Sequence, residues 1–250
     1  MAVNTDKNSY TVIFAVVMVV VVGSVLALTA SGLSERIKEN ERFEKQQNIL
    51  YAMGVNQNPD EGTVAFIPAT EVAQEFTTYI KEQLVIENGV PTKNDQAYLI
   101  DLKKEENAAK EGRTRKLPLF IGEKDGEKSY IFPMRGKGLW DAIWGFVAVN
   151  SDMEVQGVYF DHKGETPGLG ANIKQRYFMD DFIGESILNG DEYAGIAVAK
   201  GNNDPINEDK TDNEVDALAG ATITGNGVSA MIKESVKLYR PYLETIRAKN

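Results

Sequence analysis

DALAGATITGNGV, residues 216–228, connects an acidic, turn-rich run to the longest amphipathic pattern in the polar part of the chain. From residue 228 to residue 246, apolar residues recur at the spacing of one helical face, which predicts a helix over this range. Thr224 or Asn226 is expected to cap the helix, because such side chains accept hydrogen bonds from the first N–H groups. Three glycines allow a tight turn with positive φ before the helix: Gly220, Gly225 and Gly227.

A turn of this kind at a helix start is a potential anion site. Its backbone N–H groups and the positive end of the helix dipole suit a phosphate. Thr222 and Thr224 add hydroxyl groups, so a phosphate could be held by an ester bond as well as by hydrogen bonds. The spacing matches neither of the common nucleotide loops, GxxxxGK[ST] and GxGxxG. From the residues alone, a capped turn without a ligand is the simpler interpretation, and both stay open.

The composition excludes several kinds of function. The chain has 250 residues, a formal net charge of −10 and no basic patch, which argues against binding to nucleic acid. It has no cysteine, so disulfides, iron–sulfur ligation and thiol chemistry are excluded. His162 is the single histidine, which argues against a zinc site or a serine triad, and no metal is expected.

Residues 8–34 contain no charged residue, and residues 12–28 are almost wholly apolar. A helix over residues 8–34 would be roughly 40 Å long at about 1.5 Å per residue, enough to cross a hydrocarbon core of about 30 Å. Residues 1–34 are therefore expected to be a single transmembrane anchor in contact with membrane lipid. A cleaved signal peptide is the alternative, but the apolar stretch is longer than a typical signal core.

The charges beside this segment bear on its orientation. Lys7 and the amino terminus precede the segment, whereas four cations follow it: Arg36, Lys38, Arg42 and Lys45. Because cations are enriched on the cytoplasmic side of a membrane span, this count weakly places the large domain in the cytoplasm.

Residues 35–95 are expected to form a helical connecting region. A polar helix over 34–53 ends at Gly54, and a second amphipathic helix is expected over 70–86. Residues 96–250 are expected to form the main domain, in which β-rich runs predict strands over 97–102, 117–121, 130–132, 143–149, 155–160 and 196–200.

The segments between these strands complete the predicted fold. Residues 150–152 read as a hairpin turn, and residues 175–188 as a helix. The charged run 103–115 is expected to be a solvated loop or a frayed helix, and residues 201–215 a mobile acidic loop. The predicted fold class is α+β: a single N-terminal transmembrane helix followed by a mixed, mainly antiparallel sheet domain with packed helices.

Two further stretches are dense in glycine. In RGKGLW (135–140), the glycines could let the backbone approach a flat ligand while Trp140 stacks on it. Lys137, Gly138 and Leu139 are the other candidate ligand contacts of this stretch. In GETPGLG (164–170), two residues could hydrogen-bond a polar ligand edge and two more could line its face: Glu165, Thr166, Gly168 and Leu169. Taken singly, each stretch also reads as an ordinary turn or exposed loop.

DALAGAT resembles the flavinylation motif of the covalent-FMN-binding domain family, in which the last threonine carries FMN through a phosphoester. The resemblance implies that Thr222 is the acceptor, with Asp216, Gly220, Ala221 and Thr224 beside the cofactor. Ala219 stands where the family usually has Ser or Thr. The order of the three glycine-containing stretches after an N-terminal span resembles the C subunits of the Na⁺-translocating NADH:quinone oxidoreductases over nearly the whole chain. The G subunits of ion-translocating ferredoxin oxidoreductases share this plan and are the alternative.

The resemblance implies a function for the chain. A flavin transferase would attach FMN to Thr222, and the flavoprotein would relay electrons among the membrane and peripheral subunits of a Na⁺-pumping NADH:quinone reductase. It also implies a single-pass protein of the cell inner membrane with its bulk on the periplasmic side, against the count of cations. Lys137 is a candidate for stabilising reduced flavin. An anchored protein that binds a phosphorylated ligand noncovalently, and a purely structural subunit, are alternatives from other classes.

Overall fold

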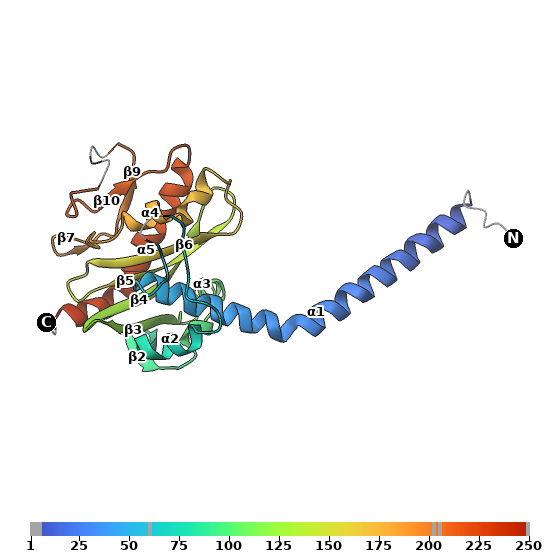
Figure 1. Ribbon diagram of the computed structural model, residues 1–250, viewed down its shortest axis with the longest axis horizontal. Coiled ribbons are helices and arrows are strands. Elements are labelled where there is room, and N and C mark those ends of the chain that lie inside the picture. The colour runs from blue at the N-terminus through green and yellow to red at the C-terminus, as the bar shows by residue number, and fades with distance from the viewer. Residues whose placement is uncertain (1–6, 60–61, 202–203, 205–206, 249–250) are drawn as a thin grey trace. The chain divides into compact units, whose positions relative to one another are not determined.

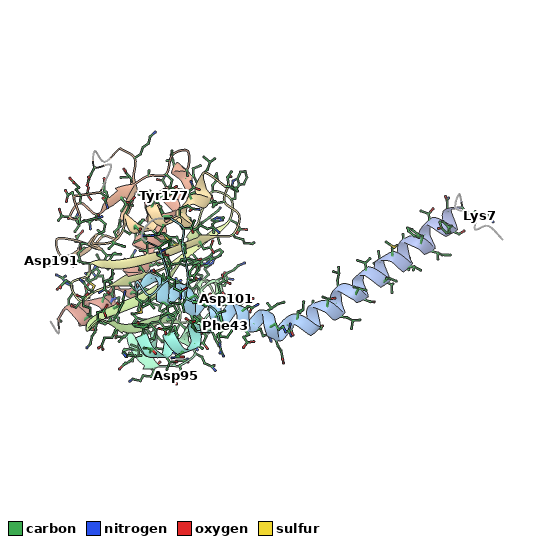
Figure 2. The ribbon with its side chains drawn as sticks, in the orientation of Figure 1. Lys7, Phe43, Asp95, Asp101, Tyr177 and Asp191 are labelled. Carbon is green, nitrogen blue, oxygen red and sulfur yellow. The ribbon has the colours of Figure 1, made fainter. Side chains whose placement is uncertain are left out.

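The computed structural model describes residues 7–59, 62–201, 204 and 207–248, and the chain divides into two compact units, Met1–Arg42 and Phe43–Asn250 (Figure 1). Phe43, labelled in Figure 2, is therefore the first residue of the second unit, and its ring packs partly buried against that unit's core. Within the described residues, one helix is long and apolar enough to cross a membrane, and it begins near the N-terminus.

This helix, α1, runs without interruption over Asn8–Ala52 and has 45 residues. The predicted polar helix over 34–53 is thus the continuation of the apolar helix rather than a separate element, because no proline lies in this range. Its apolar side chains from Val12 to Leu33 are exposed, whereas Ile49 and Leu50 are fully buried. The helix ends at Ala52, and Gly54, two residues further on, has φ 77° as the predicted cap requires.

The second unit is built on a six-stranded sheet in the order β2-β1-β3-β4-β5-β6. Each strand is antiparallel to its neighbours. The strands are β1 Ile80–Glu87, β2 Val90–Lys93, β3 Leu117–Lys124, β4 Glu127–Lys137, β5 Ala142–Val149 and β6 Val155–His162. An apolar N-terminal helix and a mainly antiparallel sheet with packed helices confirm the predicted fold class. The hairpin predicted at residues 150–152 joins β5 to β6.

The two outer strands of this sheet differ in how their edges are covered. All four residues of β2 are exposed, and the strand contains Pro91 and Lys93. Beside β6, the segment that follows α4 supplies main-chain partners: Val155 donates its N–H to the Glu185 carbonyl at 2.8 Å, and Gly184 donates to the Val155 carbonyl at 2.8 Å.

One face of the sheet is covered by the end of α1 together with α2 (Val72–Tyr79). Phe76 of α2 contacts Phe120 of β3 edge to face, with ring centroids 6.5 Å apart. Gly157 of β6 leaves room for the end of α1, since a Cβ there would collide with the carbonyl of Ala52. On this side α3 (Leu102–Lys110) contributes Glu106, whose carboxylate pairs with Arg135 of β4 at 2.8 Å.

The opposite face is covered by α5 (Thr222–Arg247), which crosses β4 (Figure 1). Phe120 is in register with Ile131, so the next residue, Phe132, points to the other face. There its ring lies 4.6 Å from the ring of Tyr239, whose hydroxyl donates to the Pro118 carbonyl at 2.7 Å. At Gly136 a Cβ would lie 2.7 Å from the Cβ of Met231, so the helix and strand meet closely.

The shorter elements lie between β6 and α5. They are η2 Gly170–Lys174, α4 Arg176–Asp180, β7 Leu188–Asn189, β8 Glu192–Tyr193, β9 Ala197–Ala199 and β10 Glu214–Asp216. The strand predicted over 196–200 is β9, which pairs with β10 in parallel. Of the acidic loop predicted over 201–215, residues 202–203 and 205–206 lie outside the described residues, and its end forms β10.

Three predicted elements are wrong. Residues 80–87 are a strand rather than the end of a helix, because this stretch pairs with β2 and β3 and buries Ile80, Leu84, Val85 and Ile86. Residues 97–102 form a short 3₁₀ turn, η1 (Ala97–Leu99), and α3 then begins with Asp101 accepting from two backbone N–H groups. The helix expected over 175–188 stops at Asp180, and Gly184 has φ 86°.

The start of α5 also differs from the prediction. The helix begins at Thr222, with Ala221 as the N-cap residue and no side-chain capping bond, so neither Thr224 nor Asn226 caps it. Gly220 alone of the three glycines has positive φ, at 71°. The other two lie inside the helix, where a Cβ on Gly225 would lie 3.0 Å from Val198 and one on Gly227 would collide with the Lys137 carbonyl.

The packing of Phe132 on Tyr239 predicts a large cost for truncation. Phe132→Ala should lower the free energy of unfolding by about 3–5 kcal/mol, because it leaves a cavity between α5 and the sheet. Leu238→Ala, on the same helix but 37% exposed, should cost roughly 1 kcal/mol or less. Urea titrations of both variants measure this, and equal losses would contradict the assignment of this face as the core.

Candidate functional site

The three glycine-containing stretches meet at the buried carboxylate of Glu165. One oxygen, Oε2, accepts a hydrogen bond from the Thr224 hydroxyl at 2.7 Å, and the other, Oε1, accepts from the Trp140 backbone N–H at 3.0 Å. Glu165 is 4% exposed and Thr224 is 1% exposed. One side chain therefore joins the segment after β4, the segment after β6 and the first turn of α5.

Two glycines make room for this carboxylate. A Cβ on Gly138 would collide with Oε1 of Glu165, and a Cβ on Gly170 would lie 2.5 Å from both Oε2 and the Thr224 hydroxyl. The backbone N–H of Glu165 also donates to Nδ1 of His162 at 3.1 Å, which fixes the loop where it leaves β6. Replacing either glycine would therefore push the three segments apart.

The charge on Glu165 is favoured by these partners. Burial by itself raises the pKa of the carboxyl, but the hydrogen bonds from Thr224 and from the backbone of Trp140 outweigh burial and hold the pKa below its ordinary value. His162 adds a smaller effect in the same direction. Glu165 is consequently an anion at neutral pH, and the hydrogen bonds that it accepts are charge-assisted.

The two threonines of the first turn of α5 have opposite environments. Thr222 is exposed, whereas Thr224 is buried and bonded to Glu165. Residues two apart on an α-helix differ by about 200° around its axis, so one hydroxyl points outward when the other points inward. The first turn of a helix also leaves N–H groups without partners in the helix, which suits an anion beside the exposed hydroxyl.

Exposed apolar side chains border this helix start. The tryptophan ring is anchored at its edge, where Nε1 of Trp140 donates to the Thr166 hydroxyl at 3.2 Å. Leu169 lies against the turn before the helix, since a Cβ on Gly220 would be 2.8 Å from its Cδ2. The exposed fractions are 44% for Leu139, 67% for Trp140, 41% for Leu169 and 57% for Ile223. Such a rim can cover a flat aromatic ligand.

The remaining predicted residues lie around this centre. Ala221 is the buried N-cap residue of α5, and Gly168 is exposed with φ 76°. Lys137 is exposed and places its carbonyl against Gly227 of α5. Asp216 ends β10, opposite Ala199 of β9 and six positions before Thr222.

The sequence did not predict the packing role of two glycines or the part played by Ile223. Gly170 and Gly227 are needed for the close approach of α5, although Gly227 was expected only in the turn, and Ile223 adds an exposed apolar side chain next to Thr222. The exposure of Ile223 could have been predicted from the helical pattern. This residue is apolar but lies outside the apolar face that begins at Val228. For the glycines, only the tertiary contacts reveal the reason.

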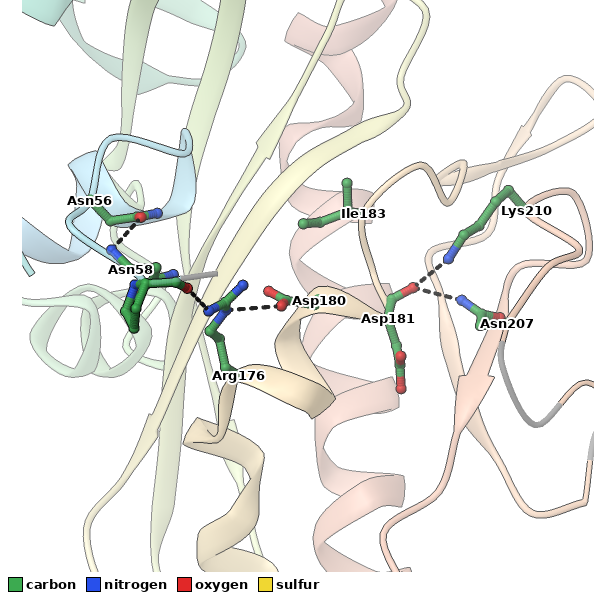
Figure 3. Close-up of a pocket in the computed structure, with 9 residues that line it drawn as sticks. Asn56, Asn58, Arg176, Asp180, Asp181, Ile183, Asn207 and Lys210 are labelled. Atoms are coloured by element: carbon green, nitrogen blue, oxygen red, sulfur yellow. Dashed lines mark hydrogen bonds and ion pairs between the residues drawn. The ribbon is translucent and has the colours of Figure 1, made fainter. Parts of the chain in front are cut away.

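A separate cavity of about 760 Å³ lies elsewhere in the second unit (Figure 3). Arg176 binds Asp180 on one side of it, and on the other side Asn207 and Lys210 both donate to the carbonyl of Asp181. None of the nine residues that line this cavity belongs to the three glycine-containing stretches: Asn56, Asn58, Pro59, Arg176, Asp180, Asp181, Ile183, Asn207 and Lys210. The site at α5 is thus distinct from this cavity.

Comparison with known proteins identifies the class to which this site belongs. Residues 138–237 match the FMN-binding domain family, a range that contains Gly138, the whole of GETPGLG and the first turn of α5. Together with the exposed rim, this match defines the C-terminal part of the chain as an FMN-binding domain.

Relatives that match most of the chain identify the family. The C subunit of the Na⁺-translocating NADH-quinone reductase of Vibrio alginolyticus is 31% identical over 244 residues, which cover 91% of this chain and 90% of that protein. The C subunit of the Yersinia pestis enzyme is 30% identical over 246 residues, covering 90% and 87%. The chain belongs to the family of Na⁺-translocating NADH-quinone reductase C subunits, which confirms the resemblance predicted from its motifs.

Solved structures agree with this assignment. The crystal structure of the Parabacteroides distasonis C subunit has a TM-score of 0.70 and 33% identity, and it covers 84% of this chain and 96% of that chain. Shewanella oneidensis NqrC has a TM-score of 0.66 and 25% identity, covering 84% and 99%.

The lowered pKa of Glu165 predicts a pH-dependent contribution to stability. Because the folded chain binds the proton less tightly than the unfolded chain, the contribution is complete above the ordinary glutamate pKa of about 4.3 and is lost as the pH falls through the folded value. Glu165→Gln cannot titrate, so the difference in unfolding free energy between the wild type and this variant should shrink below about pH 4.3. Urea titrations from pH 7 to pH 3 measure it. A difference that stays constant would contradict the assignment.

Proposed function

We propose that Thr222 carries FMN through a phosphoester and that the chain relays electrons within a Na⁺-translocating NADH-quinone reductase. The observation that carries this proposal is the contrast between the two hydroxyls: that of Thr222 is exposed, and that of Thr224 is buried and bonded to Glu165. A modifying enzyme can reach the first and not the second. The match to the FMN-binding domain family and the names of the relatives support the identity of the cofactor and of the complex.

The residues around α5 suit the parts of FMN. The N–H groups of the first turn and the helix dipole would bind the phosphate attached to Thr222, with Gly220 and Ala221 shaping the turn. Trp140 and Leu169 would cover the ring system, together with Leu139, Ile223, Gly138, Gly168 and Thr166. FMN supplies one- and two-electron transfer when bound, and the chain supplies its position and surroundings. Lys137 and Asp216 would set the charge near it.

We further propose that three parts of the chain have different functions. Residues 1–34 anchor the chain in the membrane, residues 35–95 connect the anchor to the main domain, and residues 96–250 bind FMN. β1 and β2 of the connecting region also complete the sheet. The anchor would keep the flavin beside the other membrane and peripheral subunits. We place the bulk of the chain on the periplasmic side of the inner membrane, where a flavin transferase would act, although the count of cations after the anchor favours the other side.

Attachment at Thr222 is tested by peptide mass mapping across residues 211–233 after coexpression with a flavin transferase. The wild type should carry the mass of one FMN on the peptide that contains Thr222, and Thr222→Ala should carry none because the oxygen of the ester is gone. Thr222→Ser keeps a hydroxyl and should retain some modification. FMN that remains covalently attached to Thr222→Ala would refute the acceptor, and flavin released by acid from the wild type would favour a noncovalent binding protein.

The proposal also predicts what the isolated chain does. The purified, flavin-loaded chain should accept electrons from a small chemical reductant but should not oxidise NADH, because a carrier of this kind depends on partner subunits for its donor. Absorbance at the flavin band and NADH consumption are measured in the same cuvette. Turnover of NADH by the chain alone would show that it is an enzyme in its own right.

A further inference from the structure

The hydrogen bond between Glu165 and Thr224 lies where it can orient the first turn of α5 as well as stabilise the fold. It joins residues 59 apart in the sequence, directly behind the turn that presents Thr222. Both partners are almost completely buried, and Gly138 and Gly170 are required for the carboxylate to fit. A bond in this place fixes the rotation of the first turn of α5 about the helix axis.

We infer that Glu165 and Thr224 form a positioning pair that turns the Thr222 hydroxyl outward and holds it in the geometry needed for FMN attachment. The inference rests on the proposed function of Thr222. Neither member of the pair is assigned a contact with FMN: the two carboxylate oxygens have partners within the protein, Thr224 and Trp140, and the Thr224 hydroxyl faces inward. The pair acts through the backbone of the first turn.

The same carboxylate links the acceptor turn to the ring-covering side chains. Its Oε1 accepts from the backbone of Trp140, and the ring of Trp140 is held by Thr166, the residue after Glu165. Release of the pair would therefore free the acceptor turn and the tryptophan loop together. A second buried hydrogen bond of α5 lies away from the acceptor turn. The Tyr239 hydroxyl donates to the Pro118 carbonyl at 2.7 Å, and Tyr239 lies 15 positions after Thr224.

The test uses two substitutions of Thr224, one that keeps the shape of the side chain and one that keeps its hydroxyl. Thr224→Val removes the hydroxyl donor and leaves Oε2 of Glu165 buried without it, whereas Thr224→Ser keeps the donor. Both variants keep the Thr222 hydroxyl, so slower attachment at Thr222 in Thr224→Val reports the lost hydrogen bond rather than a lost acceptor. Tyr239→Phe is the matched control, because it removes one buried hydrogen bond from the same helix away from the acceptor turn.

Two readouts are taken on the full chain in detergent. Backbone amide exchange, measured without flavin, should be roughly 10- to 100-fold faster at residues 138–141 and 220–226 in Thr224→Val, the range expected when a hydrogen bond to a charged group is lost. In FMN attachment, the Thr222 oxygen bonds to the FMN phosphorus of FAD, the pyrophosphate bond breaks, AMP leaves and the hydroxyl proton passes to solvent. This attachment, followed by intact mass, should slow by about tenfold or more in Thr224→Val. Thr224→Ser and Tyr239→Phe should match the wild type in both measurements.

The possible outcomes distinguish a positioning effect of the pair from a general loss of stability and from failure of the proposed function. Attachment at the wild-type rate in Thr224→Val overturns the inference, even if exchange is faster. Equal slowing in Tyr239→Phe also overturns it, because stability alone would then explain the effect. Glu165→Gln, which retains an acceptor and gains a donor, should lie between the serine and valine variants. If the wild type itself takes up no FMN at Thr222, the proposed function fails, while the exchange data still show whether the pair holds the turn.

Discussion

The close contact between α5 and the sheet is the constraint on which the rest of this domain depends. Gly136 on β4 and Gly227 on α5 remove the side chains that would hold the two elements apart. Only at this short distance can a threonine in the first helical turn reach a carboxylate in the loop after β6. Packing of the helix, exposure of one hydroxyl and burial of the other are therefore consequences of a single geometric condition.

Much of the sheet could be predicted because its signals are local. Residues 143–149 and 155–160 carry continuous β-rich runs on either side of a turn, and they became β5 and β6. The three glycine-containing stretches were also recognisable, since glycine-dense segments between regular elements are rare without a reason in backbone geometry. Their order along the chain was enough to indicate the family, which the relatives then confirmed.

The features that could not be predicted from the sequence depend on contacts between residues far apart in the chain. Residues 80–87 carry apolar spacing compatible with a helix or a strand, and pairing with β2 and β3 decides between them. The Thr224 partner of Glu165 lies 59 residues further on, so no local pattern indicates this hydrogen bond. For the same reason, the burial of Thr224 and the exposure of Thr222 became evident only once the start of α5 was known.

The exposed outer strand β2 has a consequence for how copies of this chain meet. An unpaired edge strand normally offers its N–H and carbonyl groups to a strand of another molecule. In β2, Pro91 has no N–H to offer, and Lys93 would bring its charge to any added strand. At the other end of the sheet, the segment at residues 184–185 already occupies the start of the β6 edge. The sheet is thus protected against edge-to-edge addition at β2 and at the start of β6, without a dedicated protective domain.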